Sequence, residues 1–332
     1  MKHKEDQLQG KVVDVTPLFE QAGIDTGIIK IIETPGMYPY KEKIEDNWAY
    51  FTAVGLKRLK DLLDKEGVTV RDVGIIGICS GVEGIAVYYV FKNQLRRLIV
   101  TDIDAEILNG TIINLRSAIK DVSVELIPIV GSFCEPIEQS GFYVDFVHGN
   151  IPNLPSTGTE DLSKGAEKGT FLPSCLYEGY NPPLEFVRWA LGAQFAYLES
   201  AKKVLKKSGS VVTELGGRMP LDIVHDMFRE CGFMLQEVIV GFKEQTEALI
   251  DFMGYHRIEK EYGVTFEFYV YDESQNVLTK QGLSNPTHEA TGDEIKKLLD
   301  NYKVSAGEAA ELYHKDVAVG HTVHLFRGVK NK

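Results

Sequence analysis

Long apolar runs, paired cysteines and clusters of basic residues are all missing from this chain of 332 residues. No apolar run reaches the roughly 20 residues that a membrane-spanning helix needs, and the polar first residues lack the core of a signal peptide. The four cysteines show no spacing typical of a metal site. We therefore expect a cytoplasmic protein with reduced thiols, no metal and no contact with a membrane.

The charge balance argues against nucleic acid as a partner. The chain has 36 Lys and Arg against 48 Asp and Glu, a formal net charge of −12. Proteins that bind phosphate backbones usually present a basic surface, whereas basic residues occur here only in short pairs such as Arg96-Arg97. We expect a small-molecule substrate, and the sequence leaves open whether the chain forms a homo-oligomer.

Strand-like and helix-like segments alternate along the middle of the chain. Apolar runs predict strands at 73–78, 97–101, 123–129, 144–148, 209–214 and 233–241. Helical spacing of apolar residues predicts helices at 82–92, 104–119, 185–206 and 220–231. This alternation predicts an α/β fold with a doubly wound, mostly parallel sheet and helices on both faces. The β-rich segments 264–271 and 320–327 predict antiparallel strands added at the C-terminal edge.

We divide the chain after residue 70. Residues 1–70, which include a predicted helix at 47–65, are expected to form an N-terminal substrate-binding or lid segment, and residues 71–330 the cofactor-binding domain. The loop 149–184 is long for a compact domain and carries Pro, Tyr and apolar residues, which favours a substrate-facing loop over a disordered linker. The charged stretch 285–315 predicts a helical surface insertion.

A glycine-rich turn follows the first strand of the alternation. The segment Val73-Gly-Ile-Ile-Gly-Ile-Cys-Ser-Gly-Val-Glu-Gly84 leads into a helix, and the next strand ends at Asp102. Glycines let the backbone approach a ligand, and an acid at this strand end can accept hydrogen bonds from ribose hydroxyls. The pattern predicts a nucleotide-like cofactor, either a dinucleotide or S-adenosylmethionine. A tight turn without a ligand and a helix N-cap are the alternatives.

An Asn-x-Pro turn, Asn150-Ile151-Pro152, follows the fourth strand. Ligands of doubly wound sheets bind at the carboxyl ends of the strands, so the Asn150 amide and the neighbouring carbonyl should lie at the cofactor edge. There they can position a nucleophile in line with a transferable methyl group. An Asn-initiated loop stabilised by prolines is the alternative. Its register with the glycine turn and Asp102 favours the catalytic interpretation and S-adenosylmethionine.

The order of these motifs resembles class I S-adenosylmethionine-dependent methyltransferases, specifically the glutamine-N5 methyltransferases of release factors. That resemblance spans residues 73–242 and includes Gly77–Gly81, Asp102, Phe133-Cys-Glu-Pro136 and Asn150-Ile-Pro-Asn153. A narrower likeness, over roughly residues 45–327, is to the methyltransferase domain of methionine S-methyltransferases. It is carried by Gly149-Asn-Ile-Pro152, Gly216-Gly-Arg218, Phe266-Glu-Phe268 and Gly320-His-Thr-Val-His-Leu325.

The resemblance implies a seven-stranded, Rossmann-like methyltransferase sheet within residues 71–330. The cofactor contacts that it implies are Gly77, Cys79, Gly81, Asp102, Ile103, Ser132, Phe133 and Asn150, and catalysis would depend on Asn150, Ile151 and Pro152. The chain departs from the family pattern at Ile75 and Ser132, where the family has acids, and at Cys79, where it has glycine. Glu83 and Glu106 are alternative acids. Asn153 replaces the tyrosine that would stack on a planar acceptor.

We expect the acceptor to be a small amino-acid-like molecule, and the specific hypothesis is the thioether sulfur of methionine, giving S-methylmethionine. A thioether has no proton to lose, and aromatic faces stabilise its cationic product. The expected substrate contacts are Tyr38, Tyr40, Trp48, Tyr50, Tyr177 and Arg218, the last for a carboxylate. The alternatives are N-methylation of a protein glutamine or a natural-product amine, a nicotinamide-dependent oxidoreductase, and a non-catalytic cofactor-binding protein.

Overall fold

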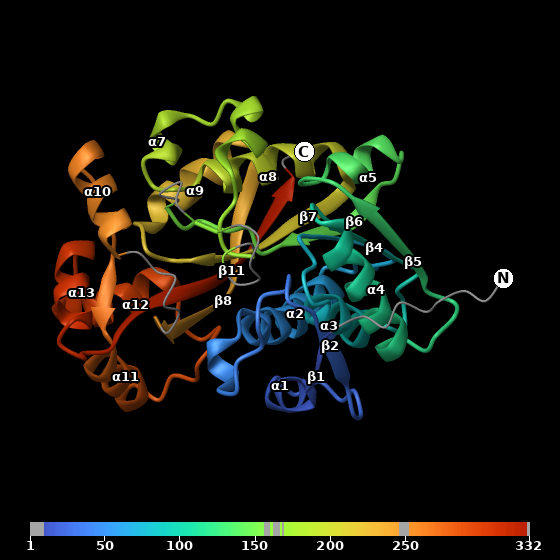
Figure 1. Ribbon diagram of the computed structural model, residues 1–332, viewed down its shortest axis with the longest axis horizontal. Coiled ribbons are helices and arrows are strands. Elements are labelled where there is room, and N and C mark those ends of the chain that lie inside the picture. Colours follow the sequence, from blue (N-terminus) through green and yellow to red (C-terminus); the bar gives the residue numbers. More distant parts are fainter. Residues whose placement is uncertain (1–9, 156–159, 162–166, 168, 246–251, 331–332) are drawn as a thin grey trace.

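The computed structural model describes residues 10–155, 160–161, 167, 169–245 and 252–330. Its main sheet has nine strands in the order β10-β9-β11-β7-β6-β3-β4-β5, with β8 also paired to β11 (Figure 1). The strands are β3 (Asp72–Ile76), β4 (Arg97–Asp102), β5 (Glu125–Val130), β6 (Val144–Gly149), β7 (Leu205–Gly216), β8 (Phe233–Glu244), β9 (Phe268–Val270), β10 (Lys303–Val304) and β11 (Val319–Lys330).

The strands β3 to β7 run parallel to one another, which confirms the predicted α/β, doubly wound and mostly parallel sheet. Strand order reverses at β3, because the chain runs outward through β4 and β5 and then returns to β6 on the other side. Parallel sheets of this kind leave a crevice at the carboxyl ends of the strands where the order reverses. The loops after β3, β4 and β6 therefore meet at one place.

The C-terminal strands are antiparallel, as predicted, but their positions in the sheet and their lengths differ from the prediction. Strand β11 does not lie at the outer edge, because it pairs with β7 and β9 on one side and with β8 on the other. Only Phe268–Val270 of the predicted strand 264–271 forms β9. The predicted helix 185–206 is divided into α7 (Leu184–Val187) and α8 (Gly192–Val204), with Ala190 between them in a left-handed conformation at φ 57°.

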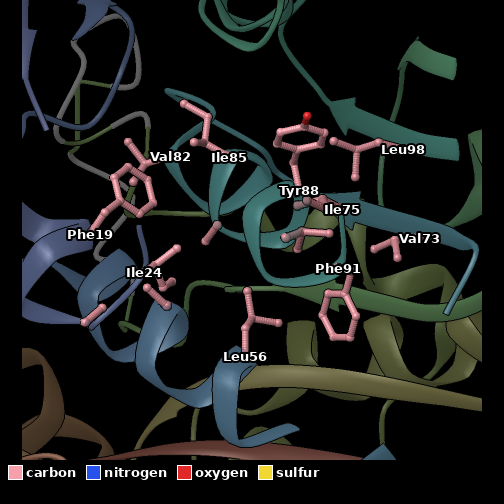
Figure 2. Close-up of a cluster of buried hydrophobic side chains, with 14 of the residues drawn as sticks. Phe19, Ile24, Leu56, Val73, Ile75, Val82, Ile85, Tyr88, Phe91 and Leu98 are labelled. Atoms are coloured by element: carbon pink, nitrogen blue, oxygen red, sulfur yellow. The ribbon is translucent and has the colours of Figure 1, made fainter. Parts of the chain in front are cut away.

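Helices cover both faces of the sheet (Figure 1). On one face lie α2 (Trp48–Lys65), α3 (Val82–Phe91) and α4 (Ala105–Ala118), and on the other α5 (Glu135–Gln139), α8 and α9 (Leu221–Glu230). Figure 2 shows the first apolar layer, in which Leu56, Ile75 and Ile85 come from α2, β3 and α3. Helix α3 is apolar nearly all round, as expected for a helix enclosed by the sheet and two other helices.

The N-terminal segment is part of this core. Strands β1 (Lys11–Asp14) and β2 (Lys30–Glu33) form a separate antiparallel pair, joined through α1 (Thr16–Gln21). Phe19 and Ile24 pack in the same cluster as β3 and α3 (Figure 2). Asn114 of α4 links this segment to the glycine turn, since its side chain donates to the carbonyls of Ile32 and Ser80 at 3.0 and 2.9 Å.

The remaining elements form a largely helical region beside β8 and β9. They are α10 (Phe252–Tyr262), α11 (Tyr271–Lys280), α12 (Gly292–Leu299) and α13 (Ala306–Tyr313), with a short 3-10 turn at Asp300–Tyr302. Elsewhere in the chain, short 3-10 turns occur at Ile44–Asp46, Ser174–Leu176 and Glu178–Tyr180. The helical character predicted for 285–315 is present, with β10 inserted between α12 and α13. Across the described part of the chain, no helix has the length and apolar character required to cross a membrane.

Candidate active site

The turn after β3 lines a cavity through Gly77 and Cys79. Gly77 is left-handed at φ 66°, and a Cβ added there would meet nothing within 4 Å. Cys79 is also left-handed, at φ 49°, a conformation that costs a non-glycine residue about 1–3 kcal/mol and persists only where neighbours hold it. Its amide donates to Asp102 Oδ2 at 3.2 Å, and its Sγ accepts from the Tyr38 amide at 3.2 Å. Burial raises the pKa of the Cys79 thiol to about 12, so this sulfur is a neutral acceptor.

Asp102, at the end of β4, is 7% exposed and faces the same turn. Its Oδ1 accepts from the Asp104 amide at 3.0 Å, and its Oδ2 accepts from Cys79. A carboxylate has about four acceptor sites, so this side chain is of a type that can accept from the hydroxyls of a diol. Asp104, and not Asp102, is the N-cap of α4, because its Oδ1 accepts from the amides of Glu106 and Ile107.

Two cavities adjoin at this strand edge and share Gly77, Cys79, Asn150, Ile151 and Pro152. The first, which we call the β4–β5 cavity, has a volume of about 100 Å³ and is further lined by Asp102, Ile103, Ser132 and Phe133. The second, the β7 cavity, has a volume of about 180 Å³ and is further lined by Tyr38, Tyr40, Trp48, Glu83, Glu214 and Arg218. Parts of the predicted substrate-facing loop 149–184 (156–159, 162–166 and 168) lie outside the described residues. Of its described part, Gly169 lines both cavities, Thr170 lines the β7 cavity, and Phe171 and Leu172 line the β4–β5 cavity.

The structure thus brings together most of the predicted site residues, with three exceptions. Gly81 lies behind the turn, where an added Cβ would meet Thr111 at 3.2 Å, so its role is packing against α4. Tyr50 is in the apolar core, edge-on to Phe51 at 5.5 Å. Two residues along a helix turn the side chain by about 200°, so Trp48 and Tyr50 face opposite ways. Tyr177 packs at the start of α8, beside Gly192.

Arg218 lines the β7 cavity with a charged guanidinium although the residue is only 1% exposed. Its Nη2 donates to Gln245 Oε1 at 3.0 Å and to His321 Nε2 at 2.7 Å. His321 Nδ1 donates to the Thr322 carbonyl at 2.8 Å, which leaves Nε2 as the acceptor. Burial, together with the Arg218 charge, holds the pKa of His321 well below its usual value, so the ring is neutral.

Arg218 Nε and Nη1 have no hydrogen-bond partner among the described residues. A buried charge without an opposite charge is strongly destabilising, so this site is suited to an anionic group of a ligand. The guanidinium fork matches a carboxylate. Trp48 forms the adjacent wall, stacked on His321 with ring centroids 5.8 Å apart.

Three acids of the β7 cavity, Glu33, Glu83 and Glu214, were not among the predicted substrate contacts. Glu83, in the first turn of α3, lies 2.9 Å from His148 Nε2, and His148 is fully buried. Glu214, near the end of β7, is also fully buried and accepts from Thr52 Oγ1 at 2.7 Å. An acid near the carboxyl end of a predicted parallel strand is the sequence signal that could have identified Glu214. Within the part of the chain that the structure describes, no group of acids, histidines or cysteines is arranged to hold a metal.

No protein-family model and no curated protein matches the chain. Among solved structures, it is similar to a protein named as an RNA methyltransferase from Pyrococcus horikoshii, with TM-score 0.43, 12% identity and coverage of 96% of this chain and 100% of that one. It is also similar to a precorrin-6y C5,15-methyltransferase from Geobacter metallireducens, with TM-score 0.38, 13% identity and coverage of 89% of this chain and 94% of that one. A third similar structure is a ribosomal protein L11 methylase from Lactobacillus delbrueckii, with TM-score 0.37, 14% identity and coverage of 61% of this chain and 76% of that one. These likenesses concern the course of the chain, and the case for a function depends on the site.

Proposed function

We propose that the chain is an S-adenosylmethionine-dependent methyltransferase. The observation that carries this proposal is the junction of the two cavities at Gly77, Cys79 and Asn150–Pro152. One cavity offers an acid at a strand end, and the other offers an unpaired cation and aromatic rings. Such a pair of sites suits a nucleoside-bearing cofactor on one side and a small acceptor on the other.

The residues present fit the cofactor. Open space at the left-handed Gly77 allows a ligand to contact the backbone, and the Asp102 carboxylate can accept from ribose hydroxyls. Ser132 and Phe133, after β5, line the far part of the same cavity. When bound, S-adenosylmethionine supplies an electrophilic methyl group on a sulfonium. Asn150, shared by both cavities, would position the nucleophile and hold it in line.

The acceptor that we propose is a small amino-acid-like molecule, and methionine is the specific candidate. Arg218 would hold its carboxylate. Tyr38, Tyr40 and Trp48 line the same cavity and can each stabilise a sulfonium product by about 0.5–2 kcal/mol. All three aromatic residues belong to the N-terminal segment, which supports the role of residues 1–70 in substrate binding. Sulfur methylation requires no general base.

N-methylation of an amine or amide is the second candidate, and the pair Glu83–His148 favours it. Glu83 lines the β7 cavity, and the 2.9 Å contact with His148 orients it. An amine nucleophile must lose a proton, and a carboxylate held in this way can accept one.

The test is incubation of the protein with methyl-labelled S-adenosylmethionine and a panel of amino acids, amines and a release-factor peptide. Label in S-methylmethionine supports the first candidate, and label in an N-methylated product supports the second. Calorimetry on the same sample measures cofactor binding. A protein that does not bind S-adenosylmethionine contradicts the proposal as a whole.

A further inference from the structure

We propose that Glu214 is a neutral carboxylic acid that donates a hydrogen bond to the carboxylate of the acceptor, beside Arg218 in the β7 cavity. The proposal rests on the methyl-transfer function above and makes its substrate class more specific: the acceptor carries a free carboxylate. Glu214 would then be a specificity-determining residue, and its protonation state would set the pH range of acceptor binding.

The contacts of Glu214 point to a protonated side chain. It is fully buried and lines the β7 cavity. Its Oε2 accepts from Thr52 Oγ1 at 2.7 Å, whereas Oε1 has no partner among the residues that the structure describes. An ionised carboxylate in this place would be a buried charge with one hydrogen bond, which proteins avoid. A carboxylic acid is neutral, and it leaves one O–H on Oε1 to donate.

The charges around Glu214 support the same state. Burial raises the pKa of its carboxyl well above the usual value, and the Glu83 carboxylate on α3 raises it further. The Thr52 hydroxyl on α2 and Lys243 on β8 lower it without reversing the direction. Lys243 lies with its Nζ 5.8 Å from the Trp48 ring centroid.

The unpartnered donors of the cavity indicate what the ligand must supply. Arg218 has two, Nε and Nη1, and the neutral Glu214 has its O–H. Both residues line the same cavity from the end of β7, four positions apart in the sequence. A carboxylate has two oxygens, each of which accepts, and an O–H donated to a carboxylate forms one of the stronger hydrogen bonds in proteins. An ester or amide of the same acceptor lacks the charge that Arg218 requires.

The first test is kinetic and compares Glu214→Gln with Glu214→Ala. The amide of glutamine can still donate, whereas alanine cannot. At pH 7 we expect Glu214→Ala to raise KM for the acceptor about 30-fold with little change in kcat, and Glu214→Gln to raise it about 3-fold. Wild-type KM should rise at alkaline pH as Glu214 ionises, and Glu214→Gln should lack that rise. The surface variant Glu125→Gln is the matched control, because the Glu125 carboxylate on β5 pairs with Arg97 on β4, away from the β7 cavity.

The second test needs no methyl transfer. The unfolded chain loses the Glu214 proton near its ordinary pKa of 4.5, while the folded protein keeps it to higher pH. Folding is therefore favoured by this group below pH 4.5, and that stabilisation is lost progressively as pH rises toward the folded pKa. Denaturant unfolding at increasing pH from pH 5 should show that wild type loses stability relative to Glu214→Gln, by up to about tenfold in the folding equilibrium constant per pH unit until the folded pKa is reached.

Three outcomes separate the claims. A stability difference between wild type and Glu214→Gln that does not change with pH means that Glu214 is ionised, and it overturns the inference. Equal KM losses in the Gln and Ala variants overturn it as well. If wild type shows the pH-dependent stability but neither binds S-adenosylmethionine nor methylates any acceptor, the proposed function fails, and with it the role given to the neutral acid.

Discussion

The two adjoining cavities are built in different ways. The β4–β5 cavity is lined mainly by loops that follow β3, β4, β5 and β6, so its residues belong to the parallel sheet itself. The β7 cavity combines the loops after β3 and β6 with the segment around Tyr38 and Tyr40, Trp48 of α2 and Arg218 after β7. Its key side chains are oriented by partners far away in the chain, such as His321, 103 residues from Arg218. The β4–β5 cavity is therefore formed by the parallel sheet and its loops, whereas the β7 cavity also needs segments from outside that sheet.

Because different segments line the two cavities, we expect mutations to change cofactor binding and acceptor binding independently. Changes at the strand-end loops should affect cofactor binding, and changes in the β7 cavity should affect the acceptor alone. Variants at Asp102, Arg218, Trp48, Tyr50 and Ser132 test whether the two cavities act separately.

The largest effect is expected from Asp102→Ala. The substitution removes the proposed ribose acceptor and also leaves the amides of Cys79 and Asp104 without a partner. Binding of S-adenosylmethionine should weaken at least about 100-fold in calorimetry, because several hydrogen bonds to a charged group are lost together. Circular dichroism checks that the variant folds. Retained micromolar affinity would show that Asp102 is not the ribose contact.

Arg218→Lys should have the next largest effect, confined to the acceptor. Lysine keeps the charge but loses the fork that matches a carboxylate. We expect KM for the acceptor to rise about 50-fold, while the Kd of S-adenosylmethionine stays within about 2-fold. Steady-state kinetics and calorimetry measure the two quantities. A parallel loss of cofactor affinity would contradict the separation of the two cavities.

Trp48→Leu and Tyr50→Leu form a matched pair on one helix. Trp48 lines the β7 cavity, whereas Tyr50 is 6% exposed in the core. Loss of the indole face should raise KM for the acceptor about 10-fold. Tyr50→Leu should leave KM unchanged and lower the free energy of unfolding by about 1–3 kcal/mol, since an aromatic core side chain is replaced by a smaller one. An increase in KM for Tyr50→Leu would return this residue to the substrate site.

The smallest effect is expected from Ser132→Asp, which restores the acid that the resembled family has at this position. If the adenine lies near the end of β5, a carboxylate there can accept from its amino group and tighten S-adenosylmethionine binding about 3- to 10-fold. Ser132→Ala is the control and should weaken binding by less than about 3-fold. Unchanged or weaker binding by the Asp variant would place the adenine elsewhere.

The sequence predicted the β4–β5 cavity better than the β7 cavity, and the reason is geometric. Apolar runs and glycine turns are local signals, and the carboxyl ends of neighbouring parallel strands must meet at one edge. Gly77, Asp102 and Asn150 could therefore be placed together without a structure. The separation of Trp48 from Tyr50 was also accessible, because helical periodicity puts positions two apart on opposite sides.

The alternation of strands and helices, the glycine turn, the strand-end acid and the Asn-x-Pro turn could all be predicted from the sequence. Each of these features depends on residues that are neighbours in the chain. Only the tertiary structure decided that β11 inserts between β7 and β8, that Thr52 meets Glu214 and that His321 holds Arg218 without neutralising it. Those pairings join residues far apart in the sequence, 103 positions for Arg218 with His321 and 162 for Thr52 with Glu214. Burial of a charge or a proton depends on everything packed around it, and no local pattern in the sequence records that packing.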